Sequence, residues 1–296
     1  MRYSLRQLEV FLATAKHENV SHAAEELAMS QSAASASLKE LETQFGIALF
    51  DRIGKRLHLS SLGQQLRSRA QHLLDEAKAF EQTLVAEDSG GTINIGATLT
   101  IGNYLTLRMI ADFRRKEPNS TVNLQIANTQ DIANRVARFE LDMGLIEGEI
   151  HNDDLEILHW RRDELVVFAN PKHPLAKSKR IPDKALRELQ WIVREPGSGT
   201  RQAFDRAMHG ILPDLTIAME LEQPKAIKHA VELGLGVGCL SAISLEEPFN
   251  RGSLVPLAVP HRDLHREWFL IMHRDKFKSP TLERWLDTCQ TQWSKT

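Results

Sequence analysis

Three stretches of the chain combine small hydroxyl or amide side chains with the pattern of a strand that runs into a helix. They are residues 96–104 with Thr98, Thr100 and Ile101, residues 128–130 with Asn128 and Thr129, and residues 194–201 with Gly197, Ser198, Gly199 and Thr200. In α/β folds, ligands bind outside the carboxyl ends of strands, where helix N-termini present free N–H groups. A plain helix cap is the better explanation of each stretch taken alone. Their joint occurrence favours a cleft between two lobes that receives a small anion.

Glu147 ends a further predicted strand, residues 141–146, and we expect it to face the same cleft. There it contacts the ligand, orients a donor or excludes larger anions. Two glycine-rich segments do not predict a nucleotide site. Residues 197–200 lack the GK[ST] ending of a P-loop, and residues 234–238 have the spacing GxGxG and precede a strand.

Catalytic and metal-binding patterns are not visible in the sequence. Ser198 lacks the GxSxG setting of a nucleophile. His261 and His265 are four residues apart without the HExxH motif of a zinc site, and Cys239 and Cys289 have no companion cysteines. We therefore expect a protein that is not an enzyme and that uses no metal or cofactor.

The first elements of the chain are three short helical patterns joined by tight turns. Ser4 and Gln7 form a capping box at the first, and Ser21 and Ser30 are expected to cap the second and the third. With a turn of only residues 28–30 between the last two, the pattern indicates a helix-turn-helix. Off the apolar face of the third helix lie polar side chains that can reach base edges or phosphates: Gln31, Ser32, Ser35 and Lys39. A small helical bundle with a solvated face is the alternative.

Residues 50–59 alternate like a short hairpin, with Gly54 at the tip and Arg52, Lys55 and Arg56 around it. A basic hairpin beside a recognition helix is placed to hold phosphates or to reach the minor groove. By itself, such a cluster of three charges is more often a solvated loop.

A long helix is predicted over residues 61–87. Its apolar residues repeat at alternating spacings of four and three, as in a heptad seam: Leu66, Ala70, Leu73, Ala77, Phe80 and Leu84. Such a stripe pairs with a second copy of the helix, or it packs on its own domain. A homodimer is what a groove-reading protein needs in order to span two half-sites.

Four segments together resemble the DNA-binding domain of LysR-type transcriptional regulators. They are residues 5–11 (LRQLEVF), 23–33 (AAEELAMSQSA), 38–42 (LKELE) and 46–52 (GIALFDR). The resemblance implies a winged helix-turn-helix, a dimerising linker helix and a two-lobed effector-binding domain of the periplasmic-binding-protein type. It also implies assembly as a homotetramer, with RNA polymerase as a further partner. Ala36 stands where many members carry arginine, so a bidentate arginine–guanine contact is absent there.

Residues 102–104 (GNY) and 195–201 (EPGSGTR) resemble the branch of this family that regulates sulfur assimilation and carbon fixation. That resemblance implies that Thr98, Thr100, Asn128 and the 198–200 turn line the effector cleft. We expect a small inorganic oxyanion, with sulfite or sulfate first and a small carboxylate or phosphorylated metabolite second. A two-lobed solute-binding protein without a DNA-binding role is the alternative.

From residue 91 onward, short β-rich runs alternate with helical patterns, which is typical of an α/β fold with largely parallel sheets. The predicted strands are residues 92–96, 121–126, 141–146, 165–168, 191–193 and 237–240. The predicted divisions are a winged helix-turn-helix at 1–60, a linker helix at 61–88, one lobe at 92–163 and 268–296, and the other at 164–267.

The charge of the chain is almost balanced, with 37 Lys and Arg, 39 Asp and Glu, and a net charge of −2. A DNA-binding protein more often has a basic surplus. However, all five charged residues from Arg52 to Arg69 are positive. We therefore expect modest non-specific affinity and strong dependence on a correctly spaced dimer on double-stranded DNA. The sequence has neither a secretory signal nor an apolar run of about 18 residues, so we expect a cytoplasmic protein without a membrane partner.

Overall fold

The computed structural model describes residues 2–53, 56–85 and 90–292. Contacts divide the chain into two compact units. The N-terminal unit comprises residues 1–91 and 274–283, and the C-terminal unit comprises residues 92–273 and 284–296. No helix in the described ranges is long and apolar enough to cross a membrane.

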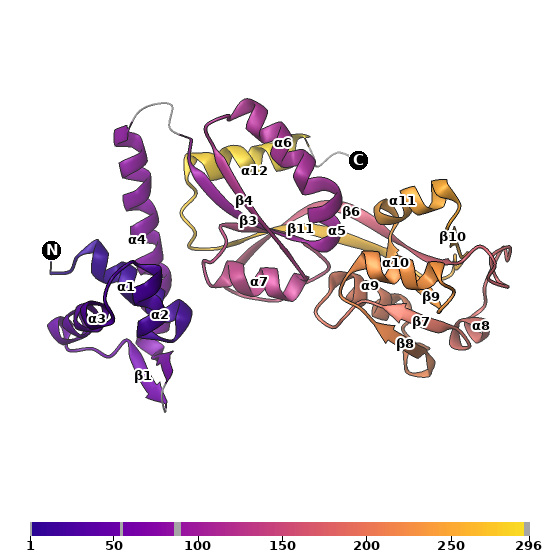
Figure 1. The fold of residues 1–296 in the computed structure, drawn as a ribbon, viewed down its shortest axis with the longest axis horizontal. Coiled ribbons are helices and arrows are strands. Elements are labelled where there is room, and N and C mark those ends of the chain that lie inside the picture. The colour runs from indigo at the N-terminus through magenta and orange to yellow at the C-terminus, as the bar shows by residue number, and fades with distance from the viewer. Residues whose placement is uncertain (1, 54–55, 86–89, 293–296) are drawn as a thin grey trace. The chain divides into compact units, whose positions relative to one another are not determined.

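The N-terminal unit contains three helices, a two-stranded hairpin and a long helix (Figure 1). Their bounds are α1 Leu5–His17, α2 Val20–Glu26, α3 Gln31–Phe45, β1 Phe50–Ile53, β2 Arg56–Leu59 and α4 Ser61–Val85. The predicted hairpin is confirmed, because Phe50 pairs with Leu59 and Asp51 with His58 in antiparallel register. The helix-turn-helix order and the long helix that follows it are confirmed as well.

Side chains at the helix starts explain where these helices begin. The Ser4 side chain accepts a hydrogen bond from the backbone N–H of Gln7, and the Gln7 side chain accepts one from the backbone N–H of Ser4. This capping box and the cap by Ser30 at α3 are confirmed. The predicted cap at Ser21 is wrong. Asn19 takes that position and accepts from the N–H of Ser21, so Ser21 lies inside the first turn.

The core of the N-terminal unit forms where small side chains let the helices approach. Ala24 of α2 and Ala34 of α3 are buried together with Phe11 of α1. The hairpin joins the same core, and the backbone N–H of Leu57 donates to the carbonyl of Glu18 at 3.1 Å. The third helix and the hairpin are therefore held by one packed unit.

The predicted heptad seam of α4 is divided between two environments. Ala70 and Leu74 are 5% and 6% exposed and lie in the core of the same unit. Leu73 and Phe80 are 40% and 64% exposed, and the side chain of Leu84 lies outside the described part of the chain. Ala70 of the predicted seam and Leu74, which is not part of it, therefore pack locally, while pairing of the exposed Leu73 and Phe80 with a second copy stays a prediction. A spacing of four places Ala70 and Leu74 on one face of the helix, which packs locally and leaves Leu73 outside.

The C-terminal unit is built on one sheet with the order β4-β3-β5-β11-β6-β9-β7-β8, and β10 pairs with β6. The strands are β3 Thr92–Thr98, β4 Thr121–Ala127, β5 Met143–Glu147, β6 Leu155–Ala169, β7 Gln190–Val193, β8 Thr216–Glu220, β9 Val237–Ser241, β10 Val255–Pro256 and β11 His265–His273. Strand β3 pairs in parallel with β4 and β5, and β7 pairs in parallel with β8 and β9. The expected parallel pairing holds only on these two sides, because β6 and β11 are antiparallel to their neighbours.

Two long strands connect the two sides of this sheet. Strand β11 pairs with β5 and with the first part of β6, while residues 165–168 of β6 pair with β9. The sequence predicted only that second part of β6, and it missed β8, β10 and β11. The predicted bounds of the two lobes, at 163/164 and 267/268, fall inside β6 and β11, and these bounds stay a prediction.

Helices cover both faces of the sheet. They are α5 Leu99–Ile101, a π-helical turn Gly102–Thr106, α6 Leu107–Lys116, α7 Thr129–Ala137, α8 Asp183–Arg187, α9 Gly199–Ala207, a 3-10 turn Leu212–Asp214, α10 Pro224–Glu232, α11 Ala242–Arg251 and α12 Pro280–Gln292. Figure 1 shows α6 and α7 on opposite faces of the β3–β5 side. The α7 and α9 helices begin at the carboxyl ends of β4 and, after a turn, β7. This brings the ends of several strands and two helix N-termini to one region.

Candidate functional site

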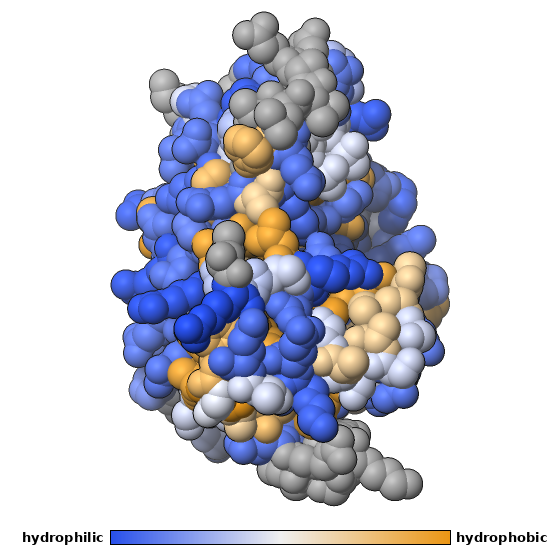
Figure 2. Space-filling view, turned by 90° about the vertical axis from the view of Figure 1, so that its left-hand side faces the viewer, coloured by the Kyte–Doolittle hydropathy of each residue, from blue (hydrophilic) through white to orange (hydrophobic). Residues whose placement is uncertain are grey.

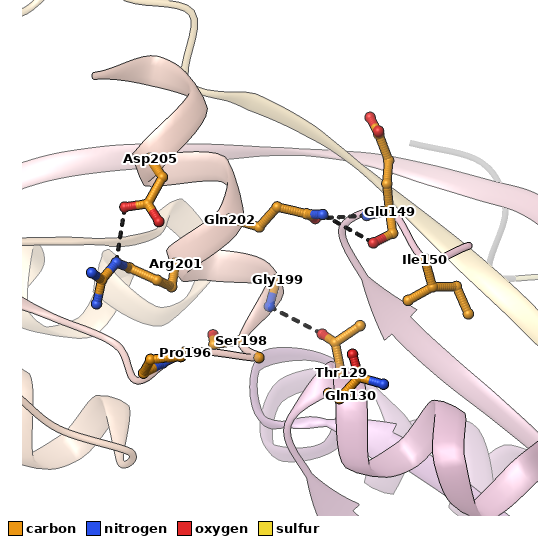
Figure 3. Close-up of a pocket in the computed structure, with 11 residues that line it drawn as sticks. Thr129, Gln130, Glu149, Ile150, Pro196, Ser198, Gly199, Arg201, Gln202 and Asp205 are labelled. Carbon is orange, nitrogen blue, oxygen red and sulfur yellow. Dashed lines mark hydrogen bonds and ion pairs between the residues drawn. The ribbon is translucent and has the colours of Figure 1, made fainter. Parts of the chain in front are cut away.

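A cavity of about 390 Å³ lies between the start of α7 and the first turns of α9 (Figure 3). Its lining comes from α7, from the segment after β5, from the turn before α9 and from α9 itself. The residues are Thr129, Gln130, Glu149, Ile150, Pro196, Gly197, Ser198, Gly199, Arg201, Gln202 and Asp205. Of the predicted effector-binding residues, Thr129, Gly197, Ser198 and Gly199 line this cavity.

The turn before α9 needs glycine at two positions. Gly197 has a φ of +86°, which side-chain-bearing residues rarely adopt. A Cβ atom on Gly199 would lie 1.9 Å from the carbonyl oxygen of Glu147. Ser198 caps the helix by accepting from the N–H of Thr200 at 3.2 Å. The glycine-serine pattern therefore lets α9 approach β5 directly.

Hydrogen bonds hold this turn and α9 against the β3–β5 side of the sheet. The N–H of Gly199 donates to the Thr129 hydroxyl at 3.1 Å, and that hydroxyl donates to the carbonyl of Glu147 at 2.9 Å. Gln202 and Glu149 form a reciprocal pair, with N–H donors on both sides at 2.8 and 3.0 Å. These hydrogen bonds therefore connect α9 and the turn before it to the β3–β5 side of the C-terminal unit.

A buried ion pair lies beside this contact. Glu147 is 1% exposed, and its Oε1 accepts from the N–H groups of Thr100 at 2.9 Å and Ile101 at 3.2 Å. Its Oε2 accepts from Arg266 at 2.6 Å and from the Thr200 hydroxyl at 3.3 Å. We call Glu147, Arg266, Thr98, Thr100, Thr200 and Asp163 the buried cluster. Donors from three separate parts of the chain therefore converge on one carboxylate.

Arg266 is shared between two carboxylates. Its guanidinium donates to Glu147 and, at 2.6 and 2.7 Å, to Asp163, while its own side chain is 1% exposed. Burial raises the pKa of the Glu147 carboxyl, but Arg266 and the Thr100 hydroxyl oppose it and hold the pKa below the ordinary value of 4.5. Burial alone would lower the pKa of the Arg266 guanidinium. Glu147 and Asp163 outweigh this effect and hold the pKa above its ordinary value. Both partners are therefore charged at neutral pH.

The predicted effector residues have different places in this arrangement. Thr100, Glu147 and Thr200 belong to the buried cluster, and Ile101 contributes its backbone N–H. Asn128 caps α7 by accepting from the N–H of Asp131, as the simpler explanation of that residue predicts.

Thr98 is 2% exposed and lies near Glu147, but its hydroxyl has no hydrogen-bond partner among the described residues. Buried hydroxyls are usually paired, so this one is available to a ligand.

Sequence reasoning missed Arg266, which is the only arginine that hydrogen-bonds to Glu147 among the described residues. It lies in β11, a strand that was not predicted, and its sequence neighbours gave no motif. The available signal was a charged residue at a buried position of the alternating run from His265 to His273, where Arg266, Trp268 and Leu270 point to one face. A charge on such a face indicates a buried partner.

The third helix presents a polar face beside its buried one. Ala34, Leu38 and Leu41 are buried, while the predicted DNA-contacting side chains on α3 are all exposed: Gln31, Ser32, Ser35 and Lys39. The N-cap Ser30 is hydrogen-bonded to Ser32, with 3.0 Å between the hydroxyl oxygens. The first turn of α3 is therefore both ordered and free to contact a partner.

The predicted basic hairpin is only partly described. Arg52 lies in β1 and Arg56 in β2, directly beside the tip of the hairpin. Lys55 lies outside the described residues, and nothing is assigned to it. The phosphate-contacting role of the three residues stays a prediction.

Two family models match the chain. The model of the LysR substrate binding domain matches residues 86–294. The model of the bacterial regulatory helix-turn-helix protein, lysR family, matches residues 5–64. The chain belongs to the LysR family of transcriptional regulators. The predicted resemblance is thereby confirmed, and the alternative of a solute-binding protein without a DNA-binding domain is wrong.

Relatives of this LysR-family regulator extend over nearly the whole chain. The Uncharacterized HTH-type transcriptional regulator YeiE of Escherichia coli K12 is 44% identical to this chain. The matched region covers 98% of this chain and 98% of the length of YeiE. The RuBisCO operon transcriptional regulator of Allochromatium vinosum is 32% identical over 95% and 93%. The relatives therefore include the carbon-fixation branch that the sequence indicated, and they are regulators, not enzymes.

Solved structures show the same fold. A full-length OxyR variant from Pseudomonas aeruginosa has a TM-score of 0.75 and 20% identity, and covers 98% of this LysR-family chain and 96% of its own. The regulatory domain of CcmR from Synechocystis, in complex with 2-PG, has a TM-score of 0.64 and 29% identity, and covers 70% and 98%. The fold class predicted from the sequence is confirmed for this regulator.

The two histidines whose spacing resembles that of metal ligands contact acidic side chains in this LysR-family protein. His261 contacts Asp183 at 2.7 Å, and His265 contacts Asp263 at 3.0 Å. Within residues 2–53, 56–85 and 90–292, no group of three or more histidine, cysteine or acidic side chains is arranged to hold a metal ion. The buried thiol of Cys239 is kept neutral, because burial raises its pKa to about 12.

Proposed function

We propose that this LysR-type regulator binds a two-half-site DNA operator and that a small oxyanion, bound in the C-terminal unit, modulates this binding or the activation of the promoter. The observation that carries the DNA half is the exposed polar face at the start of α3, in the same packed unit as the hairpin that holds Arg52 and Arg56. Gln31, Ser32 and Ser35 have short polar side chains that can reach base edges in the major groove.

A small anion suits the buried cluster because its donors already hold a carboxylate. Two backbone N–H groups, the Thr200 hydroxyl and Arg266 surround Glu147, and the unpaired Thr98 hydroxyl lies beside it. Such a donor set recognises oxyanions. The CcmR regulatory domain, which is 29% identical to this chain, is known in complex with 2-PG. Sulfite or sulfate is our first candidate, and a small carboxylate or phosphorylated metabolite is the second.

A small anion that binds in the buried cluster would affect the contact between the two sides of the C-terminal unit. The Gly199–Thr129 and Gln202–Glu149 hydrogen bonds bridge these sides next to the buried cluster. A ligand that favours one arrangement of the sides shifts the equilibrium by its difference in affinity, typically about 1 to 3 kcal/mol. That coupling would change the spacing of the DNA-binding units and their contacts with RNA polymerase.

A second copy of the chain is the expected partner of the N-terminal unit. A mostly apolar groove of about 490 Å³ lies between α1, α3 and α4, and exposed apolar residues border it. They are Phe45, Leu62 and Leu73, and Phe80 is a further exposed apolar residue of α4. Figure 2 shows apolar patches among hydrophilic residues on this side. We expect α4 of a second copy to cover the groove, and the dimers to associate into tetramers.

The test of the DNA half is a comparison of two variants on several DNA fragments, including the promoter region of the protein's own gene. Arg52→Ala is expected to lower affinity on all fragments alike and to reduce the salt slope by about one. Gln31→Ala is expected to reduce the preference for the protected sequence, at a cost of about 1 to 3 kcal/mol. No sequence-preferring footprint on any fragment would contradict the proposal, as would an equal loss on all sequences for Gln31→Ala.

The test of the effector half is titration calorimetry with sulfite and with sulfate. Thr100→Ala and Ser198→Ala are expected to weaken binding and to leave basal DNA affinity unchanged, since both residues lie in the C-terminal unit. Thr216→Ala is the matched control, because Thr216 is an exposed threonine of β8. Loss of DNA affinity in both test variants would contradict the separation of the two roles.

A further inference from the structure

Glu147 occupies the donors that an oxyanion would use. Both of its carboxylate oxygens are hydrogen-bonded, to two N–H groups on one side and to Arg266 and Thr200 on the other. A carboxylate can only accept hydrogen bonds. An anion that enters beside it therefore needs either a proton of its own to donate or a proton on Glu147.

The surroundings of Glu147 do not supply a spare positive charge. Arg266 from β11 is already shared with Asp163 of β6, and Arg194, which follows β7, forms a bidentate pair with Glu195 at 2.7 and 2.8 Å. Two guanidinium groups thus face three carboxylates. A fully ionised oxyanion would add to an excess of negative charge in a site with almost no exposure to water.

Two acidic oxygens that share a buried site retain one proton between them, because both cannot be ionised together. We propose that Glu147 makes the effector site selective for oxyanions whose conjugate acids titrate near neutral pH, such as sulfite, over permanently ionised ones such as sulfate. This inference rests on the proposed oxyanion effector, and it makes Glu147 the residue that determines specificity. In the complex, one proton joins an oxygen of Glu147 to an oxygen of the ligand.

Thr98, which lies beside Glu147, is a second group that favours a ligand at this point. Thr98 is 2% exposed, and its hydroxyl has no hydrogen-bond partner in the part of the chain that the structure describes. A hydroxyl both donates and accepts, so it can bind an ionised or a protonated oxygen of the ligand. It therefore favours an oxyanion without deciding which form binds, and the selection is left to Glu147.

The experiment uses the full chain and four probes in two matched pairs: sulfite and sulfate, and selenite and selenate. The second pair controls for air oxidation of sulfite. We expect sulfite and selenite to bind at least about tenfold more tightly than sulfate and selenate in titration calorimetry. Above the pH at which each free anion loses its proton, affinity should fall by up to about tenfold per pH unit, because each complex retains one proton.

The decisive variant is Glu147→Gln, which replaces the carboxylate with a neutral group of the same shape. Sulfate and selenate should gain at least about tenfold in affinity, and the pH dependence of sulfite binding should become shallower. Glu246→Gln is the matched control, since Glu246 is an exposed carboxylate of α11 that belongs neither to the cavity nor to the buried cluster. Its binding preference should equal that of the parent protein.

The outcomes separate the two proposals. Equal binding of both members of each pair, or an unchanged preference in a folded Glu147→Gln protein, overturns the role of Glu147 and leaves an oxyanion effector in place. Binding of none of the four probes overturns both. Should Glu147→Gln fail to fold, calorimetry of the parent protein in buffers of different ionisation enthalpy decides, because sulfite binding above its own titration must take up close to one proton.

Discussion

Arg266 sets the charge balance of the buried cluster. It is the cation between Glu147 and Asp163, with three contacts of 2.6 to 2.7 Å to them. Burying two carboxylates near each other is costly unless a cation pairs with both. The residue that fixes this site thus comes from β11, far along the chain from the glycine-serine turn and the threonines that the sequence singled out.

Replacing Arg266 is expected to destabilise the protein strongly. Arg266→Met leaves two buried carboxylates without their cation, so the free energy of unfolding should fall by about 3 to 5 kcal/mol. Chemical denaturation followed by circular dichroism measures this change. Arg162→Met is the control, because Arg162 pairs with Glu267 through a side chain that is 80% exposed, and such pairs contribute about 0 to 1 kcal/mol. A similar loss in both variants would show that the buried pairing has no special weight.

Glu147 should also make stability depend on pH. Its pKa lies below the ordinary value of 4.5 in the folded protein, so it stabilises the fold above pH 4.5 and this contribution is lost as the pH falls through the folded pKa. We expect the free energy of unfolding to fall more steeply below pH 4.5 in the parent protein than in Glu147→Gln. Denaturation curves over a pH series measure both slopes, and parallel curves would contradict the assignment.

At the scale of elements, the recognition helix depends on its first turn. Ser30 accepts from the N–H of Ala33 at 3.2 Å, and the exposed residues Gln31 and Ser32 follow directly. Helix α4 has a different task, because one of its faces fills the local core while Leu73 and Phe80 stay exposed. The same periodic pattern therefore serves folding on one side and leaves a surface for association on the other.

Loss of the Ser30 cap should weaken both the helix and its DNA contacts. Ser30→Ala removes the acceptor for one N–H group and is expected to cost about 1 kcal/mol of stability. Operator affinity should fall with it, since the residues that we propose to read bases lie in the first turn. Thermal unfolding and a DNA titration measure the two effects. Ser35→Ala is the control for stability, because Ser35 is an exposed residue inside α3, and an equal loss there would contradict the capping argument.

At the scale of the whole molecule, the near-neutral charge predicts weak non-specific DNA binding, so we expect a dimer to supply affinity through two half-sites. The net charge is −2, and all five charged residues from Arg52 to Arg69 are positive. Few phosphate contacts per chain mean a modest salt-dependent contribution. Association through the groove and α4 would double these contacts.

Charges placed on the exposed face of α4 should separate the dimer. Leu73→Glu combined with Phe80→Glu puts two carboxylates on a surface that a second copy would cover, and their burial is unfavourable. Analytical ultracentrifugation should then show a smaller species, and operator affinity should fall by at least about tenfold. Leu233→Glu is the control, because Leu233 is 63% exposed in the C-terminal unit. An unchanged dimer in the double variant would refute the interface.

The sequence alone determined the features that depend on local patterns. Helix caps at Ser4 and Ser30, the hairpin at residues 50–59 and the strands with continuous apolar runs follow from short-range periodicity and hydrogen bonding. The family followed from ordered motifs in the first 52 residues. The polar ends of β3, β4 and β5 were also visible, because strand ends and helix starts have distinctive residue types.

Only the tertiary structure decided which of those polar groups share a site. Thr100, Glu147 and Thr200 meet around Arg266. In the chain, Thr100 lies 166 residues before Arg266, and Thr200 lies 66 residues before it. Strand order depends on long-range pairing that no local pattern encodes, and β11 places its arginine between two carboxylates for that reason. Periodicity likewise could not say that Ala70 and Leu74 pack locally while Leu73 stays exposed, because that depends on where the neighbouring helices lie.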